Sequence, residues 1–165
     1  MPSSKRDTAL ALADATAAPG ISATLAFTAV VDVAARQALG RSGLGERFIV
    51  PITGGWFRGG PGHAGLAGRV LAGGADRQLL RADGIKELHA LYELQADDGA
   101  VITVDNRVLI DEAVQPLRYA LSHIRLQAPE GPHAWLNRRR FAGTLQPLRP
   151  QRDAVLVRCW LLDSA

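Results

Sequence analysis

The sequence is poor in several residue types that mark particular classes of protein. It contains one cysteine, Cys159, among 165 residues, so it cannot form an internal disulfide and is not a disulfide-stapled scaffold. No apolar run approaches the roughly 18 residues that a membrane-spanning helix requires. Because Cys159 lies in the apolar run DAVLVRCWLLD, we expect it to be a buried hydrophobic residue. These features predict a cytoplasmic protein without a membrane partner.

Aromatic residues and lysine are also scarce. Aromatic side chains make up 5% of the chain, and Lys5 and Lys86 are its only lysines. The densest basic cluster is Arg138–Arg140, whose side chains we expect to alternate between the two faces of a strand. Nucleic-acid-binding surfaces concentrate positive charge and interleave it with aromatic side chains that stack on bases. Since the formal net charge is only +3, we expect no nucleic-acid partner.

Motifs for metal binding and for nucleophilic catalysis are missing from the sequence. The four histidines are scattered, without HxH or HxxxH spacing, which disfavours a metal site, although ligands from distant strands could still assemble one. The sequence also has no G-x-S-x-G nucleophile elbow. We therefore predict a protein that uses neither a metal nor another cofactor.

One glycine motif suggests a nucleotide. Gly60–Gly65, GPGHAG, matches the GxGxxG spacing of dinucleotide-binding folds. That motif needs a central strand before it and a helix after it, because the helix N-terminus binds the pyrophosphate. Here Pro51 and Gly54-Gly55 come before the motif and three more glycines follow within residues 66–76, which favours an edge strand or a bend, and no helix. We interpret Gly60–Gly65 as a loop.

The length of the chain suits one ordinary domain. Residues 1–20 end at Pro19-Gly20, and we interpret them as a flexible N-terminal tail or a short helix. Their apolar centre, ALALA, is shorter than the roughly 7 to 15 residues of a secretory signal core. Residues 21–165 are predicted to form the single folded domain.

From Ile21 onward, apolar residues recur at every second position, as in half-buried strands. Ile21–Val33 is predicted to be a long strand, and Asp83-Gly84 and Asp97–Gly99 separate later runs as turns. Only residues 36–43 and 109–121 leave room for short helices.

Residues 85–95, IKELHALYELQ, allow two interpretations. A helix would bring Leu88 and Tyr92 to one face, and the residues are good helix formers. A strand would instead point Leu88, Ala90 and Tyr92 inward. We favour the strand, because two turns flank the segment and a β-branched run follows it.

Seven or eight strands joined by glycine-rich turns predict an all-β fold, either a barrel or a sandwich. The many glycines within the strand runs favour a small antiparallel β-barrel, in which bulges and bends allow closure. We expect a single domain with at most one or two short helices. A barrel of about eight strands can hold a ligand in its interior.

Four stretches of the sequence carry a resemblance to a known family. They are VPITGGWFRG, GLAGRVLAGGADRQLLRADG, LHALYELQADDGAVITV and HAWLNRRRFAGTL. In this order, from about Leu25 to Leu161, the chain resembles the domain of unknown function family 3237, also called uncharacterised protein family 0311. The resemblance implies a calycin-like or allene-oxide-cyclase-like barrel without an agreed general activity. The family has tryptophan where this chain has Arg77, and its loop before Gly65 is shorter.

Asp76 is the first candidate for acid–base catalysis. It follows two glycines in GGADRQ, and burial in an apolar barrel would raise its pKa toward neutrality. The alternative is that Asp76 caps a turn by accepting backbone N–H bonds. Arg81 could bind an anionic or carbonyl oxygen of a substrate, or could form an ion pair with Asp76 or Asp83.

Tyr92 and Trp56 are candidate substrate-binding residues, and Tyr92 is a candidate wall of the site. In the strand interpretation Tyr92 enters the core, where its hydroxyl needs a partner or a ligand. Trp56, in VPITGGWFRG, is assigned to the same substrate-binding group. Glu87, His89 and Glu93 share the opposite face of the strand, which we expect to be solvated.

The segment HAWLNRRRF supplies the remaining candidates. As a strand, it would place Trp135 and Asn137 on one face, where they could stack on and hydrogen-bond a ring-shaped ligand. His133 at the strand entrance would act as a proton shuttle. The alternative is that Trp135 fills the barrel and Asn137 satisfies a bulge. Asp97–Gly99 is interpreted only as a turn.

Together these residues predict a cofactor-independent enzyme of the isomerase, cyclase or lyase type, which acts by acid–base chemistry on a partly apolar small molecule inside the barrel. The assigned residues are Asp76, His133 and Asn137 for catalysis, and Trp135, Tyr92, Arg81 and Trp56 for substrate binding. The alternatives are a non-catalytic binding protein for a hydrophobic or aromatic molecule, and a structural scaffold. Exposed strand edges would allow a homodimer or a higher homo-oligomer.

Overall fold

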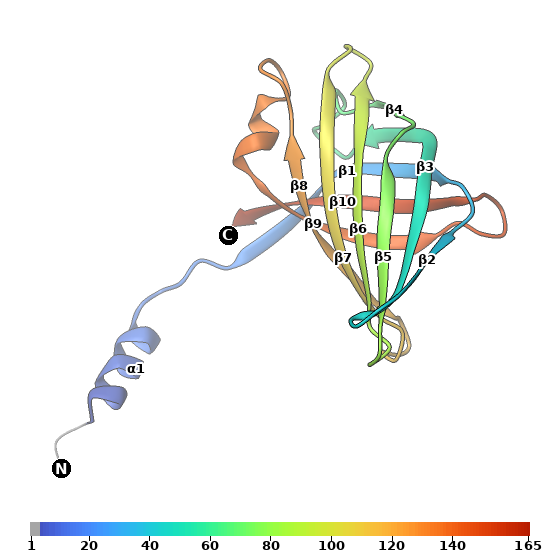
Figure 1. Cartoon of the computed structure of the whole chain (residues 1–165). Helices are drawn as coiled ribbons and strands as arrows, with labels where there is room; N and C mark the ends of the chain where they lie inside the picture. The colour runs from blue at the N-terminus through green and yellow to red at the C-terminus, as the bar shows by residue number, and fades with distance from the viewer. Residues whose placement is uncertain (1–3) are drawn as a thin grey trace.

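The computed structural model describes residues 4–165, and most of its regular elements are strands (Figure 1). The elements are α1 (Lys5–Ala15), β1 (Ile21–Val33), β2 (Gln37–Ser42), β3 (Gly45–Gly59), β4 (Gly68–Val70), β5 (Ala75–Arg81), β6 (Lys86–Ala96), β7 (Val101–Asp111), β8 (Tyr119–Gln127), the 3-10 helix η1 (Ala134–Arg138), β9 (Arg140–Pro147) and β10 (Ala154–Ser164). This composition confirms the prediction of an all-β fold.

Within the described residues, eight strands close into an antiparallel barrel. The order around the barrel is β1, β10, β9, β8, β7, β6, β5 and β3, and β3 pairs with β1 again to close it. β2 extends the sheet beside the first half of β3, and the short β4 lies between the second half of β3 and β6. The prediction of a small antiparallel β-barrel is therefore confirmed.

A bend in β3 lets the barrel close. The first half, Gly45–Pro51, pairs with β5, and the second half, Gly54–Gly59, pairs with β1. Gly55 has φ +128°, and a Cβ at this position would lie 2.0 Å from the carbonyl oxygen of Val30. Only glycine tolerates this backbone conformation and this approach. The bend predicted from Pro51 and Gly54-Gly55 is confirmed.

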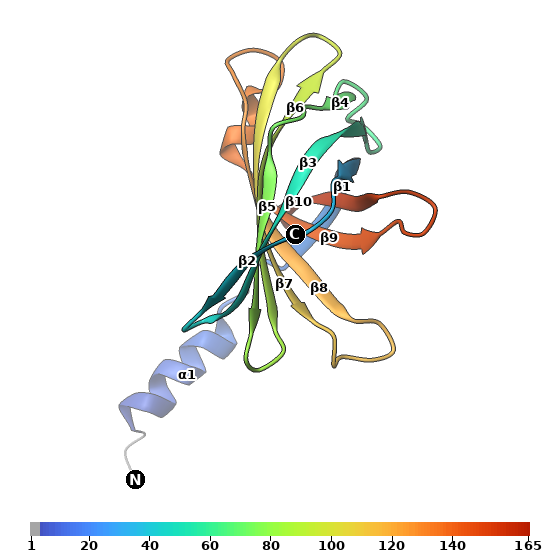
Figure 2. The same cartoon turned by 45° about the vertical axis from the view of Figure 1, so that its right-hand side comes forward.

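The two ends of the barrel carry different loops (Figures 1 and 2). The turns that join β2 to β3, β5 to β6 and β7 to β8 lie at one end, which we call the hairpin end. The β6–β7 turn and η1 lie at the other end, which we call the η1 end. This division matters because the polar residues of interest separate between the two ends.

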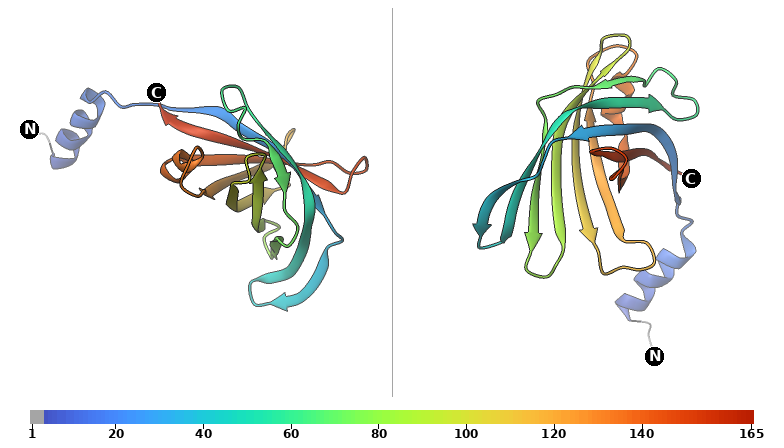
Figure 3. Two further views of the ribbon diagram at one scale, coloured as in Figure 1. Left: turned by 90° about the horizontal axis from the view of Figure 1, so that it is seen from above. Right: turned by 90° about the vertical axis from the view of Figure 1, so that its right-hand side faces the viewer.

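The N-terminal helix α1 lies away from the barrel (Figures 1 and 3). Ser4 caps it by accepting a hydrogen bond from the Asp7 backbone N–H, and the Asp7 side chain accepts one from the Ser4 N–H. None of its 11 residues is buried. No helix in residues 4–165 combines the length and the apolar character needed to cross a membrane.

The barrel interior follows the alternation of the strands. Tyr92, Leu94, Ile102 and Val104 are each no more than 1% exposed and pair across β6 and β7. The strand interpretation of residues 85–95 is therefore confirmed. Cys159 is fully buried, as expected.

The two segments that left room for short helices are not helical. Residues 36–43 contain β2, which pairs with β3 and has a register shift between Ala38 and Gly40, where Gly40 has φ +87°. Residues 109–121 contain the end of β7, a turn, and the start of β8. Both segments lie at hairpin ends, where the backbone pairs with a neighbouring strand. Helix propensity, which depends on the local sequence, does not account for this pairing.

Candidate functional site

The barrel contains a cavity of about 180 Å³ whose lining extends to Arg118 at the hairpin end. Its walls are mostly aliphatic side chains from β1, β3, β9 and β10. The polar residues that line it are Asp76, Gln78, Tyr92, Asn106 and Arg118. A few convergent polar groups in an apolar cavity are typical of small-molecule sites.

Asp76, Asn106 and Tyr92 lie together because of the strand register. Asp76 on β5 and Asn106 on β7 both pair with Ala90 on β6, so Asp76, Ala90 and Asn106 form one row across the sheet. The small Ala90 side chain leaves space between the two polar groups. Tyr92 lies two residues further along β6 and therefore points to the same inner face.

The Asp76 carboxyl group is held inside this cavity. Gln78 Nε2 donates a 2.7 Å hydrogen bond to Asp76 Oδ2. The other oxygen, Oδ1, is inaccessible to solvent and has no partner among residues 4–165. Burial raises the pKa of Asp76 from 3.8 to about 6, and Gln78 and the nearby His89 offset part of that rise. A carboxyl group with such a pKa exchanges a proton near neutral pH.

Tyr92 and Asn106 complete the polar group. The Tyr92 hydroxyl and Asn106 Oδ1 are buried, and neither finds a hydrogen-bond partner within the described part of the chain. Burial, with Cys159 and Asp76 nearby, raises the pKa of Tyr92, so its hydroxyl stays protonated. Buried polar atoms are nearly always paired in native proteins. Three such atoms around one cavity therefore indicate that a ligand or water completes their hydrogen bonds.

The structure separates His133, Trp135 and Asn137 from this cavity, which corrects the expectation of a strand through HAWLNRRRF. Ala134–Arg138 forms η1, with hydrogen bonds from Ala134 N to Gly131 O and from Leu136 N to His133 O. Leu136 is 1% exposed. The segment coils because a tight turn buries Leu136 over the η1 end.

Each of these three residues has a structural partner at the η1 end. His133, 5% exposed, lies with Nε2 2.8 Å from Asp98 Oδ2. Asn137 donates from Nδ2 to Ala128 O and accepts from Ala128 N, both at 2.9 Å. The backbone N–H of Ala100 and then His133 lower the pKa of Asp98. The turn at Asp97–Gly99 is confirmed, and Asp98 in this turn also forms a hydrogen bond with His133.

The loop Gly60–Gly65 also belongs to the η1 end. The His63 ring stacks on Trp135, with centroids 5.2 Å apart. A Cβ at Gly60 would lie 2.1 Å from Leu25 O. The loop interpretation is confirmed, since turns lie within the motif and strand β4, not a helix, follows it. Gly60 allows a close backbone contact.

Arg81 and Trp56, assigned above to substrate binding, have side chains on the outside of the barrel and do not line the inner cavity. Arg81 pairs with Asp83 and, at 3.0 Å, with Glu87. The ion pair with Asp83 is the alternative that the sequence left open. Trp56 is 64% exposed. Both residues occupy strand positions whose side chains point away from the cavity, as does Arg77.

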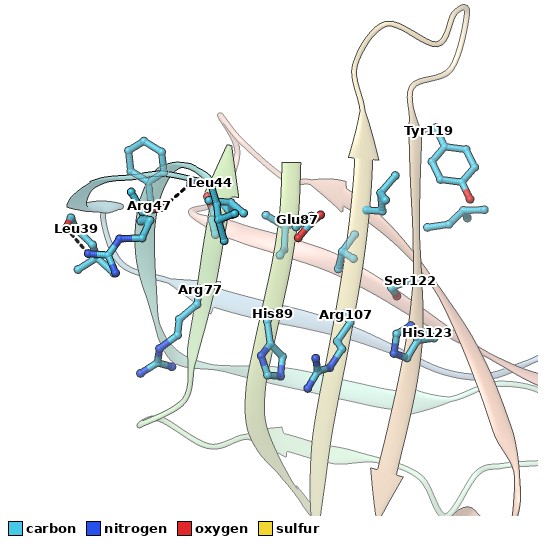
Figure 4. A pocket seen from close by; sticks show the side chains of 18 of the residues that line it. Leu39, Leu44, Arg47, Arg77, Glu87, His89, Arg107, Tyr119, Ser122 and His123 are labelled. Carbon is cyan, nitrogen blue, oxygen red and sulfur yellow. Dashed lines mark hydrogen bonds between the residues drawn. The ribbon is translucent and has the colours of Figure 1, made fainter. Parts of the chain in front are cut away.

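A second depression lies on the outside of β5, β6, β7 and β8. It is an open groove of about 890 Å³. Arg77, His89, Arg107 and His123 form a row across these four strands (Figure 4). His89 and Arg107 share Asp105, at 2.9 and 3.4 Å. The groove is open to solvent, whereas the inner cavity is more shielded from water. Because electrostatic interactions are stronger away from water, we favour the inner cavity as the site of catalysis.

Sequence reasoning missed Asn106, Gln78 and Arg118. Asn106 lies in VITVDNRVL, where alternation places it on the inner face with Val104 and Val108. A polar residue at an inward position of an apolar strand is the signal that could have identified it. Arg118 offered no such signal, because it lies in a turn. Residues 4–165 contain no cluster of three His, Cys, Asp or Glu side chains suited to a metal ion.

Comparison with known proteins agrees with this architecture. The family model described as "Protein of unknown function (DUF3237)" matches residues 21–162. A UPF0311 protein of Rhodopseudomonas palustris strain TIE-1 is 31% identical over 139 residues, which cover 76% of this chain and 88% of that protein.

Solved structures show the same fold. A conserved protein of unknown function from Rhodopseudomonas palustris aligns with TM-score 0.78 and 28% identity over 88% of this chain and 99% of its own. A protein described as an enzyme from Penicillium herquei aligns with TM-score 0.66 and 22% identity over 90% and 97% of the two chains. At that identity, the second likeness concerns the fold alone.

Proposed function

The chain belongs to the DUF3237 family, and from that premise we propose that it is a cofactor-independent enzyme that moves a proton on a small, partly apolar molecule bound in the barrel. The reaction type would be an isomerisation, cyclisation or lyase reaction. The observation that carries the proposal is the Asp76 carboxyl group, with a pKa of about 6, beside two further buried polar groups that lack protein partners among residues 4–165.

The polar group supplies the parts of acid–base catalysis. Asp76, ionised above its pKa, would take a proton from the ligand and return it at another atom. The protonated Tyr92 hydroxyl would donate to an oxygen on which negative charge develops. Asn106 would orient the ligand by accepting from a hydroxyl or amino group. The ligand would therefore carry a hydrogen-bond donor within an apolar body.

A binding protein is the second candidate. The volume of about 180 Å³ is smaller than the roughly 300–1,000 Å³ typical of drug-sized ligand sites, which favours a compact ligand in either case. A solved structure of the same fold is described as an enzyme, which supports the first candidate by analogy of fold only. In both cases the partner is a small molecule in the cytoplasm, and self-association stays a prediction.

The test uses a panel of phenols and enolisable aromatic ketones in D₂O. Ligand-observed NMR measures binding, and loss of the α-proton signal measures proton exchange. An enzyme should exchange the protons of a bound ketone, and Asp76→Asn should abolish exchange while binding remains. A binding protein should bind without any exchange. Absence of binding across the panel would contradict both candidates for this class of ligand.

A further inference from the structure

The hairpin end of the cavity carries a single charged lining residue, Arg118. It lies in the β7–β8 turn, directly before β8 begins at Tyr119. Arg118 hydrogen-bonds Glu112, which comes six positions after Asn106 and just beyond the end of β7, so Arg118 lies nearer the hairpin end than Asn106 does. The cavity thus has the polar group of Asp76 and Asn106 at its inner end. At the end nearer the hairpins, which we call its mouth, it has a guanidinium group that is partly exposed to solvent.

Arg118 retains positive charge and free donors. Its Nη1 donates a 3.0 Å hydrogen bond to Glu112 Oε1, and Lys86 Nζ approaches the same oxygen at 3.3 Å. Two cations around one carboxylate leave a net charge of about +1 at the mouth. A guanidinium group has five N–H donors, and those on Nε and Nη2 of Arg118 have no hydrogen-bond partner among residues 4–165.

The position of Arg118 suits recognition of an anion. Its side chain is 27% exposed, so it is partly desolvated, and arginine pairs with carboxylates through two parallel N–H···O bonds. Asp76 is the only carboxylate among the lining residues, and it forms no ion pair with Arg118. A ligand carboxylate at the mouth would therefore be attracted to Arg118, and only Glu112 would compete with it for the guanidinium group.

We propose that the ligand is a compact organic acid: a molecule with a carboxylate at the mouth beside Arg118, an apolar middle, and a hydrogen-bond donor at the inner end beside Asp76 and Asn106. This inference rests on the proposed function, because it assumes that the same cavity is the ligand site. It narrows the substrate class from partly apolar molecules in general to hydroxylated or aminated organic acids.

The outer groove defines a ligand less well than the inner cavity does. Its arginines and histidines are exposed to water, and nothing about its shape selects one occupant. The inner cavity, by contrast, combines the positive charge of Arg118, apolar walls, and the buried acceptor oxygens of Asp76 and Asn106.

The test compares two probes of equal shape, 3-(4-hydroxyphenyl)propionate and its primary amide, by isothermal titration calorimetry. The acid should bind the wild-type chain about tenfold more tightly than the amide, as expected for hydrogen bonds to a charged group. Arg118→Gln should remove this preference, because the acid loses its charged partner and its affinity falls to about that of the amide. Arg81→Gln is the matched control, because it makes the same change of charge at the same end but outside the barrel.

A second variant acts in the opposite direction. Glu112→Gln removes the carboxylate that shares Arg118, so the acid should bind more tightly than to the wild-type chain. Equal binding of acid and amide to the wild-type chain, or equal loss of both with Arg118→Gln, would overturn the acid assignment and leave the cavity as the ligand site. If neither probe binds, both this inference and the proposed function fail for this ligand class.

Discussion

Asp76 and Asn106 flank Ala90 in one cross-strand row, and each presents to the cavity an oxygen that no residue of the described chain satisfies. The strand between them contributes only a methyl group. The distance between the two polar side chains is thus a property of the barrel register, and the space above Ala90 is the centre of the candidate site.

Filling that space should block the site without harm to the fold. Ala90→Leu adds three carbon atoms where a cavity exists, so we expect a change in the free energy of unfolding of about 1 kcal/mol or less and a loss of ligand binding. Urea unfolding and ligand-observed NMR measure the two effects. Ala29→Leu is the control, because Ala29 is fully buried and outside the cavity lining; it should cost about 1–3 kcal/mol. Normal binding by Ala90→Leu would place the ligand elsewhere.

The raised pKa of Asp76 predicts a pH dependence of stability. The folded chain holds the proton up to about pH 6, whereas the unfolded chain releases it near pH 4, so ionisation costs stability as pH rises through this window. Relative to Asp76→Asn, the wild-type chain should lose up to about 3 kcal/mol between pH 4 and pH 7. Urea unfolding at a series of pH values tests this. Parallel curves for the two chains would show that Asp76 titrates normally.

Tyr92→Phe should separate stability from function. The buried hydroxyl has no partner in residues 4–165, so its removal should leave the free energy of unfolding unchanged or raise it by about 1 kcal/mol. The same change should weaken ligand binding by about tenfold, because one hydrogen bond to the ligand is lost. Thermal unfolding and calorimetry provide the two readouts. A clear loss of stability would mean that the hydroxyl is satisfied within the fold.

Asn137→Ala should have the opposite signature. The Asn137 amide forms two 2.9 Å hydrogen bonds with the backbone of Ala128, and their loss should cost about 1–2 kcal/mol. Ligand binding and proton exchange should stay unchanged, since the residue lies at the η1 end. Loss of exchange at unchanged stability would restore Asn137 to the catalytic site.

The strands could be predicted from the sequence because their signals are local. Alternation and Asp-Gly turns identified β6 against a competing helical interpretation. The same alternation failed in β1, where a bulge between Leu25 and Phe27 buries both Ala26 and Phe27. A bulge depends on the partner strand, and no feature of β1 alone reveals it.

The site could be predicted only in part. Asp76 and Tyr92 were selected as an acid–base group and a core tyrosine, and both line the cavity. His133, Trp135 and Asn137 were placed wrongly, because the prediction assumed a strand where the chain forms η1. The prediction used the two-residue period of a strand for these residues, so it also assigned each side chain to the wrong face.

The sequence by itself determined the elements of this protein: the period-two runs, the turns between them, and a buried lone cysteine. These follow from interactions among residues close in the chain. The tertiary structure alone decided which polar residues meet. Asp76, Tyr92 and Asn106 come from β5, β6 and β7, and only the pairing register and the closure of the barrel bring their side chains to one cavity, because strand pairing is a contact between residues distant in the chain.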